Sequence, residues 1–163
     1  MFAGAGGNVI AFALSNRWSK IIAIEKNPSV IACAQNNAHI YDVYDLITWV
    51  NDDSFSYLAA NTLSINPDET VIFASPPWGG PGYTSDKIFN LSTMAPYSIK
   101  EIHDACRGME SALYLPRTSD LRQIAKLAPG GKKVEVVQYC VQGASKALVA
   151  YIPAAEDEST SDS

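Results

Sequence analysis

The segment Ser75–Gly80, with the sequence SPPWGG, combines residue types that could bind and orient a planar amine. Pro76 and Pro77 fix backbone torsions, so their carbonyl groups hold defined directions. Trp78 adds an indole face on which an aromatic ring could stack. The segment follows the apolar run TVIFA, and the end of a strand in an open α/β sheet is where such folds bind ligands. The pattern predicts a site for an aromatic amine; a proline-rich turn with a partly buried tryptophan is the alternative.

A glycine-rich segment near the N-terminus, GAGGN, could hold a cofactor that contains adenosine. Gly4 and Gly6 would let the backbone approach a ligand because glycine has no Cβ, and Asn8 ends the segment. Glu25, at the end of the next apolar run, could accept hydrogen bonds from both ribose hydroxyls. Val9 stands where a dinucleotide fingerprint has its third glycine, which favours a ligand without pyrophosphate. The alternative is a simple helix-entry loop with a solvated glutamate.

An acidic pair follows the third apolar run, in VNDDSF. Asp53 could accept a hydrogen bond from an adenine amino group at the same edge of the sheet. Equally, Asp52 or Asp53 could cap a helix that begins there. The position of the pair relative to the other two segments slightly favours ligand binding.

The cysteine and histidine residues of the sequence give little support for a metal site or a disulfide bond. Cys33, Cys106 and Cys140 are odd in number, far apart and without a paired CxxC spacing, so we expect free buried thiols. The two histidines, His39 and His103, are not clustered and are expected to be surface or core residues without a catalytic part.

The composition excludes several classes of protein. The chain has 163 residues, of which 47% are hydrophobic, and no apolar run approaches the ~18–20 residues that a membrane helix needs. The opening residues lack the charged region of a signal peptide. The formal net charge of −5 argues against a protein that coats nucleic acid along many phosphates, although local contact with one nucleotide stays open.

Short apolar runs alternate with longer segments of helical spacing, which is typical of an α/β domain with a mainly parallel sheet. The predicted strands are residues 21–25, 46–50, 70–74, 112–116, 133–139 and 146–152, and the predicted helices are residues 8–18, 28–40, 98–108 and 119–127. The pair QG at residues 142–143 could join the last two strands as a C-terminal antiparallel hairpin.

The start of the chain differs from that of a complete domain of this kind. A strand should precede the glycine-rich loop, yet only MFA stands before Gly4, so we expect the first strand to be missing. The strands on either side of it would then be left unpaired. We interpret residues 1–153 as one domain that is incomplete at its N-terminus, and residues 154–163 as a disordered acidic tail.

Four segments together resemble a known family. GAGGNVIAFAL, IAIEKNPSVIACAQNNAHIY, SPPWGGPGY and YLPRTSD are similar, in this order, to the catalytic domain of the trimethylguanosine synthase family, the RNA cap guanosine-N2 methyltransferases. The resemblance extends to about Ile152. It implies a Rossmann-like class I methyltransferase fold that depends on S-adenosyl-L-methionine (AdoMet). The implied substrate is 7-methylguanosine-capped RNA, and the product is the 2,2,7-trimethylguanosine cap of small nuclear and nucleolar RNAs. The implied location is the nucleus, alone or together with the cytoplasm.

The resemblance also implies roles for particular residues. Trp78 would stack on 7-methylguanine, a cation whose contact with an indole face contributes roughly 2 kcal/mol when desolvated. Arg117 would contact the cap phosphates, with a solvated surface charge as the alternative. Ser75 and the Pro76 carbonyl would hold the 2-amino group in line with the AdoMet methyl, for two successive transfers with product release between them. Positioning, which can contribute ~7–11 kcal/mol, would replace a strong base.

The N-terminal end of the chain departs from the family pattern. The family's aspartate ahead of the glycine-rich loop and its upstream helical extension have no counterpart, so we expect this chain alone to bind AdoMet and cap weakly or not at all. Other interpretations stay open: an amino-methyltransferase for another nucleobase or a protein side chain, or an inactive truncated relative that only binds caps. A dehydrogenase is the least favoured, because of Val9 and Trp78.

Overall fold

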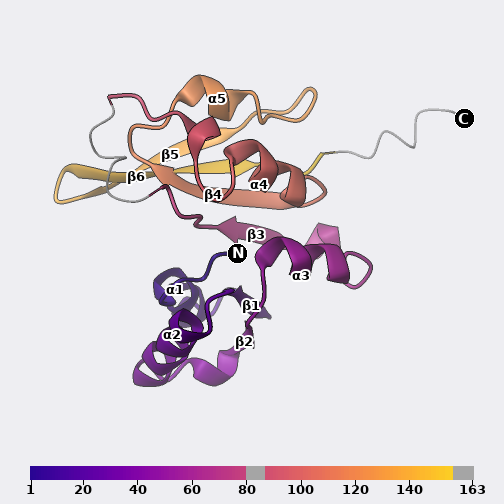
Figure 1. The fold of residues 1–163 in the computed structure, drawn as a ribbon, viewed down its shortest axis with the longest axis vertical. Coiled ribbons are helices and arrows are strands. Elements are labelled where there is room, and N and C mark those ends of the chain that lie inside the picture. Colours follow the sequence, from indigo (N-terminus) through magenta and orange to yellow (C-terminus); the bar gives the residue numbers. More distant parts are fainter. Residues whose placement is uncertain (80–86, 156–163) are drawn as a thin grey trace, which may run out of the picture. The chain divides into compact units, whose positions relative to one another are not determined.

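The structure, a computed structural model, describes residues 1–79 and 87–155, and the chain divides into two compact units, Met1–Ser64 and Ile65–Ser163. Figure 1 labels the α-helices and strands of both. Gly80 of the SPPWGG segment lies outside the described residues, as does the expected acidic tail from residue 156 onward. No helix in the described ranges is long and apolar enough to cross a membrane.

The first unit is a pair of parallel strands with three α-helices. Its elements are α1 (Gly7–Leu14), β1 (Ile21–Ile24), α2 (Pro28–Ile40), the short 3-10 helix η1 (Tyr44–Leu46), β2 (Ile47–Val50) and α3 (Ser54–Asn61). Strands β1 and β2 pair in parallel, from Ile21 opposite Ile47 to Ile24 opposite Val50. The unit's core joins α1, β1, α2 and β2 through the buried side chains of Val9, Ile10, Ala13, Ala23, Ala38, Val43 and Ile47.

Local signals account for the start of α2 and the end of α1. The predicted helix over residues 28–40 is confirmed: the Asn27 side chain accepts hydrogen bonds from the backbone N–H groups of Ser29 and Val30, and proline occupies the first turn. The predicted end of the first helix at residue 18 is wrong. Helix α1 ends at Leu14, because Asn16 adopts a left-handed backbone conformation with φ 50°.

The second unit is a four-stranded sheet with short helices. Its elements are η2 (Pro67–Glu69), β3 (Val71–Ala74), η4 (Leu91–Thr93), α4 (Ile99–Cys106), β4 (Glu110–Pro116), α5 (Leu121–Ala125), β5 (Glu135–Val141) and β6 (Ala144–Ile152). The strand order is β3-β4-β6-β5. Strands β3 and β4 are parallel, whereas β6 runs antiparallel to both β4 and β5. One strand pair of this sheet is thus parallel and two are antiparallel, and the predicted C-terminal antiparallel hairpin is confirmed.

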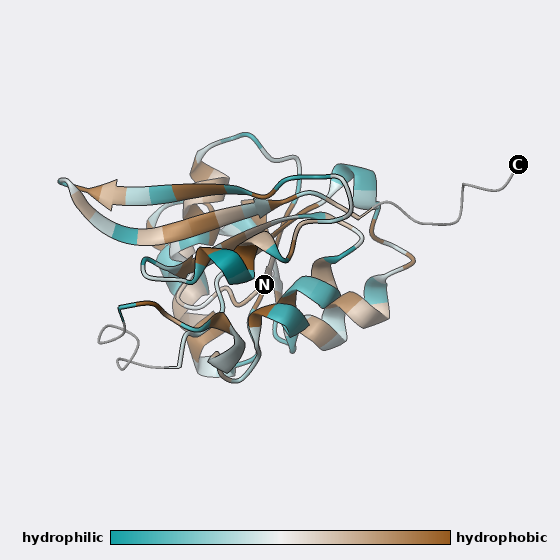
Figure 2. Cartoon of the chain, turned by 90° about the horizontal axis from the view of Figure 1, so that it is seen from above, coloured by the Kyte–Doolittle hydropathy of each residue, from teal (hydrophilic) through white to brown (hydrophobic). Residues whose placement is uncertain are grey.

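The hairpin turn and the central strand follow from the sequence. Gln142 and Gly143 both have positive φ, 50° and 77°, as a two-residue hairpin turn requires. Strand β4 is buried along most of its length, with Leu113 and Leu115 fully inaccessible. Strand β5 at the sheet edge is largely exposed, and hydrophobic and hydrophilic stretches are interspersed along the β5–β6 hairpin, at upper left in Figure 2. The buried residues of β4 therefore hold the C-terminal end of this strand firmly in place.

Candidate functional site

The glycine-rich loop of the first unit is tied to the end of β1. The Ala3 N–H donates to the Ile24 carbonyl at 2.9 Å, and the Gly6 N–H donates to the Ala3 carbonyl at 3.1 Å. Gly4 and Gly6 have φ values of 56° and 89°, a left-handed conformation that side chains with a Cβ rarely adopt. Apart from its two chain neighbours, no described residue places an atom within 4 Å of the position of a Cβ on Gly4, so the backbone there is accessible to a ligand.

The carboxylate of Glu25 joins this loop to the start of α2. One oxygen accepts a hydrogen bond from the Gly4 N–H and the other from the Asn27 N–H, each at 3.0 Å. The side chain is half-buried directly after β1. Because an ionised carboxylate offers about four acceptor positions, two remain in which hydroxyl donors could bind. Among the predicted cofactor residues, the structure brings Gly4 and Glu25 into direct contact, with Gly6 two residues further along the loop.

Asp53 follows β2, the parallel neighbour of β1, and caps α3. Its side chain accepts hydrogen bonds from the N–H groups of Phe55 and Ser56, at 3.0 and 3.3 Å. The capping alternative is therefore observed. Because β1 and β2 run in parallel, Glu25 and Asp53 follow neighbouring strand ends. Asn8 lies one residue after the start of α1 and is exposed.

Sequence reasoning missed Asn51. Its side-chain amide donates to the carbonyls of Glu25 and Lys26, at 2.9 and 3.1 Å, and so fixes the chain on which the Glu25 carboxylate stands. Its position beside the acidic pair was the only signal, and asparagine at a strand end is common in ordinary turns.

Substitution of Gly6 by alanine should destabilise the first unit. The new Cβ would lie 3.1 Å from the Ala34 Cβ on α2, and the backbone would hold alanine at φ 89°. Both the contact and the backbone strain are unfavourable, each by an amount on the order of 1 kcal/mol or more. Urea unfolding followed by circular dichroism should show a loss of about 2–3 kcal/mol. Gly108→Ala is the matched control, since a Cβ there meets no atom within 4 Å and its φ is not in the left-handed region.

In the second unit, Ser75, Pro76 and Trp78 follow β3 directly. Pro76 is buried, whereas Ser75 and Trp78 are half-buried. The indole of Trp78 stacks on the ring of Tyr114, with centroids 5.8 Å apart and planes 18° from parallel, and its Nε1–H donates to the Tyr114 carbonyl at 3.3 Å. The indole plane is therefore fixed by β4, the parallel neighbour of β3. Sequence reasoning missed Tyr114, which lies three residues before Arg117.

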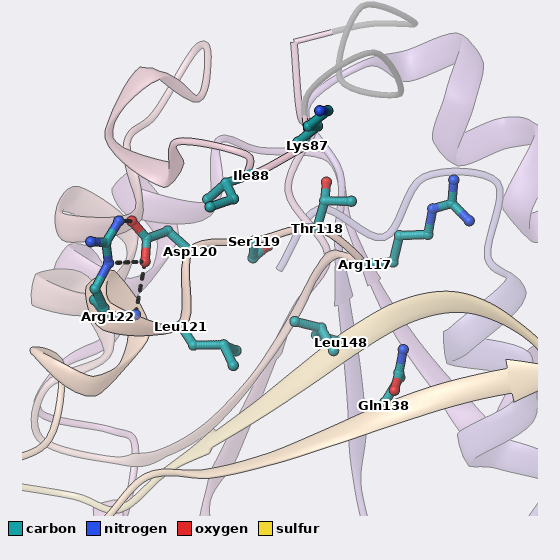
Figure 3. A pocket seen from close by; sticks show the side chains of 10 residues that line it. All are labelled: Lys87, Ile88, Arg117, Thr118, Ser119, Asp120, Leu121, Arg122, Gln138 and Leu148. Atoms are coloured by element: carbon teal, nitrogen blue, oxygen red, sulfur yellow. Dashed lines mark hydrogen bonds and ion pairs between the residues drawn. The ribbon is translucent and has the colours of Figure 1, made fainter.

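Arg117 comes directly after β4 and its side chain is exposed. It lines a pocket of about 470 Å³ in the second unit, which Figure 3 shows from close by. Trp78, through Tyr114, and Arg117 are thus both positioned by the end of one buried strand.

Two of the three cysteine predictions are wrong. Cys106 is buried, but Cys33 and Cys140 are exposed. Burial raises the pKa of the Cys106 thiol to about 11, so this thiol stays protonated and unreactive at pH 8.

Ellman's reagent at pH 8 should therefore modify two thiols rapidly in the folded protein and the third, Cys106, only after denaturation. Rapid modification of all three in the native state would contradict the packing around α4.

The described residues hold no group of three or more histidine, cysteine, aspartate or glutamate side chains that could bind a metal ion. Burial lowers the pKa of His103 on α4, whose Nδ1 has no hydrogen-bond partner within the described ranges. His39 is exposed and stacks on Tyr44, with ring centroids 3.9 Å apart.

The sequence profile of the RNA cap guanine-N2 methyltransferases matches residues 1–155. The chain belongs to this family. Trimethylguanosine synthase of Schizosaccharomyces pombe is 29% identical over 154 residues, which cover 92% of this chain and 62% of that protein. Trimethylguanosine synthase of Saccharomyces cerevisiae is 30% identical over 129 residues, or 77% of this chain and 40% of that protein. This family member thus spans less than two thirds of either relative.

A solved structure supports the fold of this cap guanine-N2 methyltransferase family member. A SAM-dependent methyltransferase from Agrobacterium tumefaciens superposes with a TM-score of 0.64 at 13% identity, over 94% of this chain and 54% of that chain. The chain therefore has the Rossmann-like class I methyltransferase fold predicted from the sequence.

Proposed function

We propose that the protein transfers methyl groups from AdoMet to the exocyclic 2-amino group of the 7-methylguanosine cap of RNA, and that two transfers give the 2,2,7-trimethylguanosine cap. The observation that carries this proposal is the tryptophan of the Ser-Pro-Pro-Trp turn, which Tyr114 holds in a fixed plane after β3. Membership of the RNA cap guanine-N2 methyltransferase family supports the same substrate.

The residues of the first unit fit an adenosine-containing cofactor. Gly4 leaves the backbone open to a ligand, and Gly6 lets the loop pack closely against Ala34 of α2. The Glu25 carboxylate lies beside Gly4 with acceptor capacity for ribose hydroxyls. Asn8 and Asp53 complete the proposed cofactor set, with Asp53 as the acceptor for the adenine amino group in addition to its capping role. When bound, AdoMet supplies an electrophilic methyl group on its sulfonium.

The residues of the second unit would bind and orient the cap. Trp78 stacks on the cationic 7-methylguanine, and Arg117 binds the cap phosphates. Ser75 and the Pro76 carbonyl hold the 2-amino group so that its lone pair faces the incoming methyl group. The alkylated amine loses its proton readily to water, so orientation replaces a catalytic base.

Mass spectrometry of a 7-methylguanosine cap dinucleotide incubated with the protein and AdoMet tests the proposal. The proposal predicts one or two methyl additions to the guanine, in contrast to the weak or absent binding expected from the N-terminal departure from the family pattern. Additions to adenine or to a protein substrate instead would favour another amino-methyltransferase. We also propose a nuclear location on the resemblance alone, which fractionation of cells that express the protein would test.

A further inference from the structure

The pocket beside Arg117 carries cations on several sides. We call it the Lys87 pocket; it has a volume of about 470 Å³, and its lining includes Lys87, Arg117 and Arg122 around the apolar side chains of Ile88 and Leu148. In Figure 3 Lys87 lies at the top, Arg122 at the left and Arg117 at the right of the pocket. A volume in this range suits a small-molecule ligand or one nucleotide.

The charges of the Lys87 pocket are only partly neutralised. Arg122 forms a two-pronged ion pair with Asp120, with contacts of 3.0 and 2.9 Å. Neither Lys87 nor Arg117 has an ion-pair partner among the described residues. A chain with a net charge of −5 therefore keeps a local positive patch in this pocket, which favours an anionic ligand.

The pocket also offers hydrogen-bonding groups. The Thr118 Oγ1 is buried and has no hydrogen-bond partner within residues 1–79 and 87–155. Gln138, from β5, adds a side-chain amide to the lining of the pocket. A buried hydroxyl without a partner is unfavourable in the folded protein, so a ligand that bonds to it would gain affinity. Hydroxyl and amide groups beside cations suit a ribose-phosphate unit.

We propose that the Lys87 pocket binds the ribose-phosphate backbone of the first transcribed nucleotide of the capped RNA. This inference rests on the proposed function, because Arg117 would contact the cap phosphates at the rim of the same pocket. Arg117 lies three residues beyond Tyr114, which is about 10 Å along an extended chain. Cap ring, cap phosphates and first nucleotide would then follow the end of β4 in order, and the protein would discriminate capped RNA from a free cap nucleotide.

The test compares a 7-methylguanosine-capped RNA pentanucleotide with 7-methylguanosine triphosphate, which lacks the first transcribed nucleotide, as substrates. For Lys87→Ala, the ratio of the KM for the pentanucleotide to the KM for the triphosphate should rise about threefold to fivefold. Lys133→Ala, which removes an exposed lysine outside the pocket, should leave the ratio unchanged. Thr118→Val should raise the ratio as well, yet raise the Tm by about 2–4 °C, because it removes a buried hydroxyl without a partner. If Thr118 had only a structural role, its substitution would change the Tm without raising the KM ratio.

Two outcomes separate the failure of this inference from that of the proposed function. If the protein methylates both substrates but neither Lys87→Ala nor Thr118→Val changes the ratio, the inference is overturned and the proposed function stands. If the protein methylates neither, binding of a fluorescent uncapped pentanucleotide decides. Lys87→Ala should then reduce the slope of log affinity against log salt by about 0.7, and an unchanged slope and affinity would overturn the inference.

Discussion

Substitution of Trp78 by alanine is expected to lower kcat/KM for the 7-methylated cap about thirtyfold. A cation on a desolvated indole face contributes roughly 2 kcal/mol, and each 1.4 kcal/mol is a factor of about ten. An unmethylated guanine carries no such charge, so the same substitution should change kcat/KM for the unmethylated cap much less. The variant should therefore lose the preference for the 7-methyl group along with most of its activity.

Initial rates on both caps, measured for wild type and variant, give this preference. Trp78→Phe should retain part of it, because phenylalanine keeps an aromatic face with a weaker quadrupole. Trp18→Ala is the matched control, since Trp18 is 48% exposed and lies in the first unit. Near-identical circular dichroism and Tm would exclude a folding defect from the lost stacking on Tyr114. An equal loss on both caps would assign Trp78 to packing and not to recognition of the methylated base.

Substitution of Glu25 by alanine is expected to weaken AdoMet binding about a hundredfold or more. The carboxylate would lose its hydrogen bonds to both ribose hydroxyls, and bonds to charged groups contribute about 1.5–3 kcal/mol each. It would also lose the bonds from the Gly4 and Asn27 N–H groups, so the loop that faces the cofactor would be less well held. Calorimetric titration with S-adenosylhomocysteine, which has the same adenosine group as AdoMet, gives the dissociation constant of this ligand for wild type and variant.

Two further variants make the Glu25 result specific. Glu25→Gln keeps one carbonyl acceptor and should lose about tenfold in affinity. Glu110→Ala removes an exposed carboxylate at the start of β4 and should leave the affinity unchanged. A Glu25→Ala variant that binds the ligand within twofold of wild type would remove Glu25 from the cofactor site and leave it as a structural bridge between the loop and α2.

Local sequence signals predicted those elements whose ends are set by neighbouring residues, such as a helix cap or a two-residue turn. The start of α2 follows from the Asn27 cap and Pro28, and the β5–β6 hairpin follows from Gln142 and Gly143, which adopt the positive φ of its turn. The end of α1 was missed because apolar spacing continues to Trp18, while the left-handed Asn16 stops the helix. The cysteine predictions failed for a related reason. Cys33 lies off the buried stripe of α2 that holds Ile31, Ala34 and Ala38, so its apolar neighbours in sequence said little about its own burial.

The candidate site was predicted by residue type, but its supports were not. Trp78 could be singled out from its turn, whereas its partner Tyr114 depends on the register of β3 and β4, a contact across 36 residues that no local pattern encodes. For Asp53 the local pattern was clear but ambiguous, since an aspartate after a strand can cap a helix or accept a hydrogen bond from a ligand. The Lys87 pocket has no sequence signature of its own, because its residues come from four separate stretches of the chain.

The central claim is that a 7-methylguanosine cap is methylated at its 2-amino group with AdoMet as donor. The most direct measurement is mass spectrometry of 7-methylguanosine and unmethylated cap dinucleotides after incubation with the protein and AdoMet, with fragmentation to locate the added methyl groups. The account predicts one or two methyl groups on the guanine N2 of the 7-methylated cap, with little product from the unmethylated cap or with Trp78→Ala. Equal methylation of both caps, or methyl groups at another position, would contradict it.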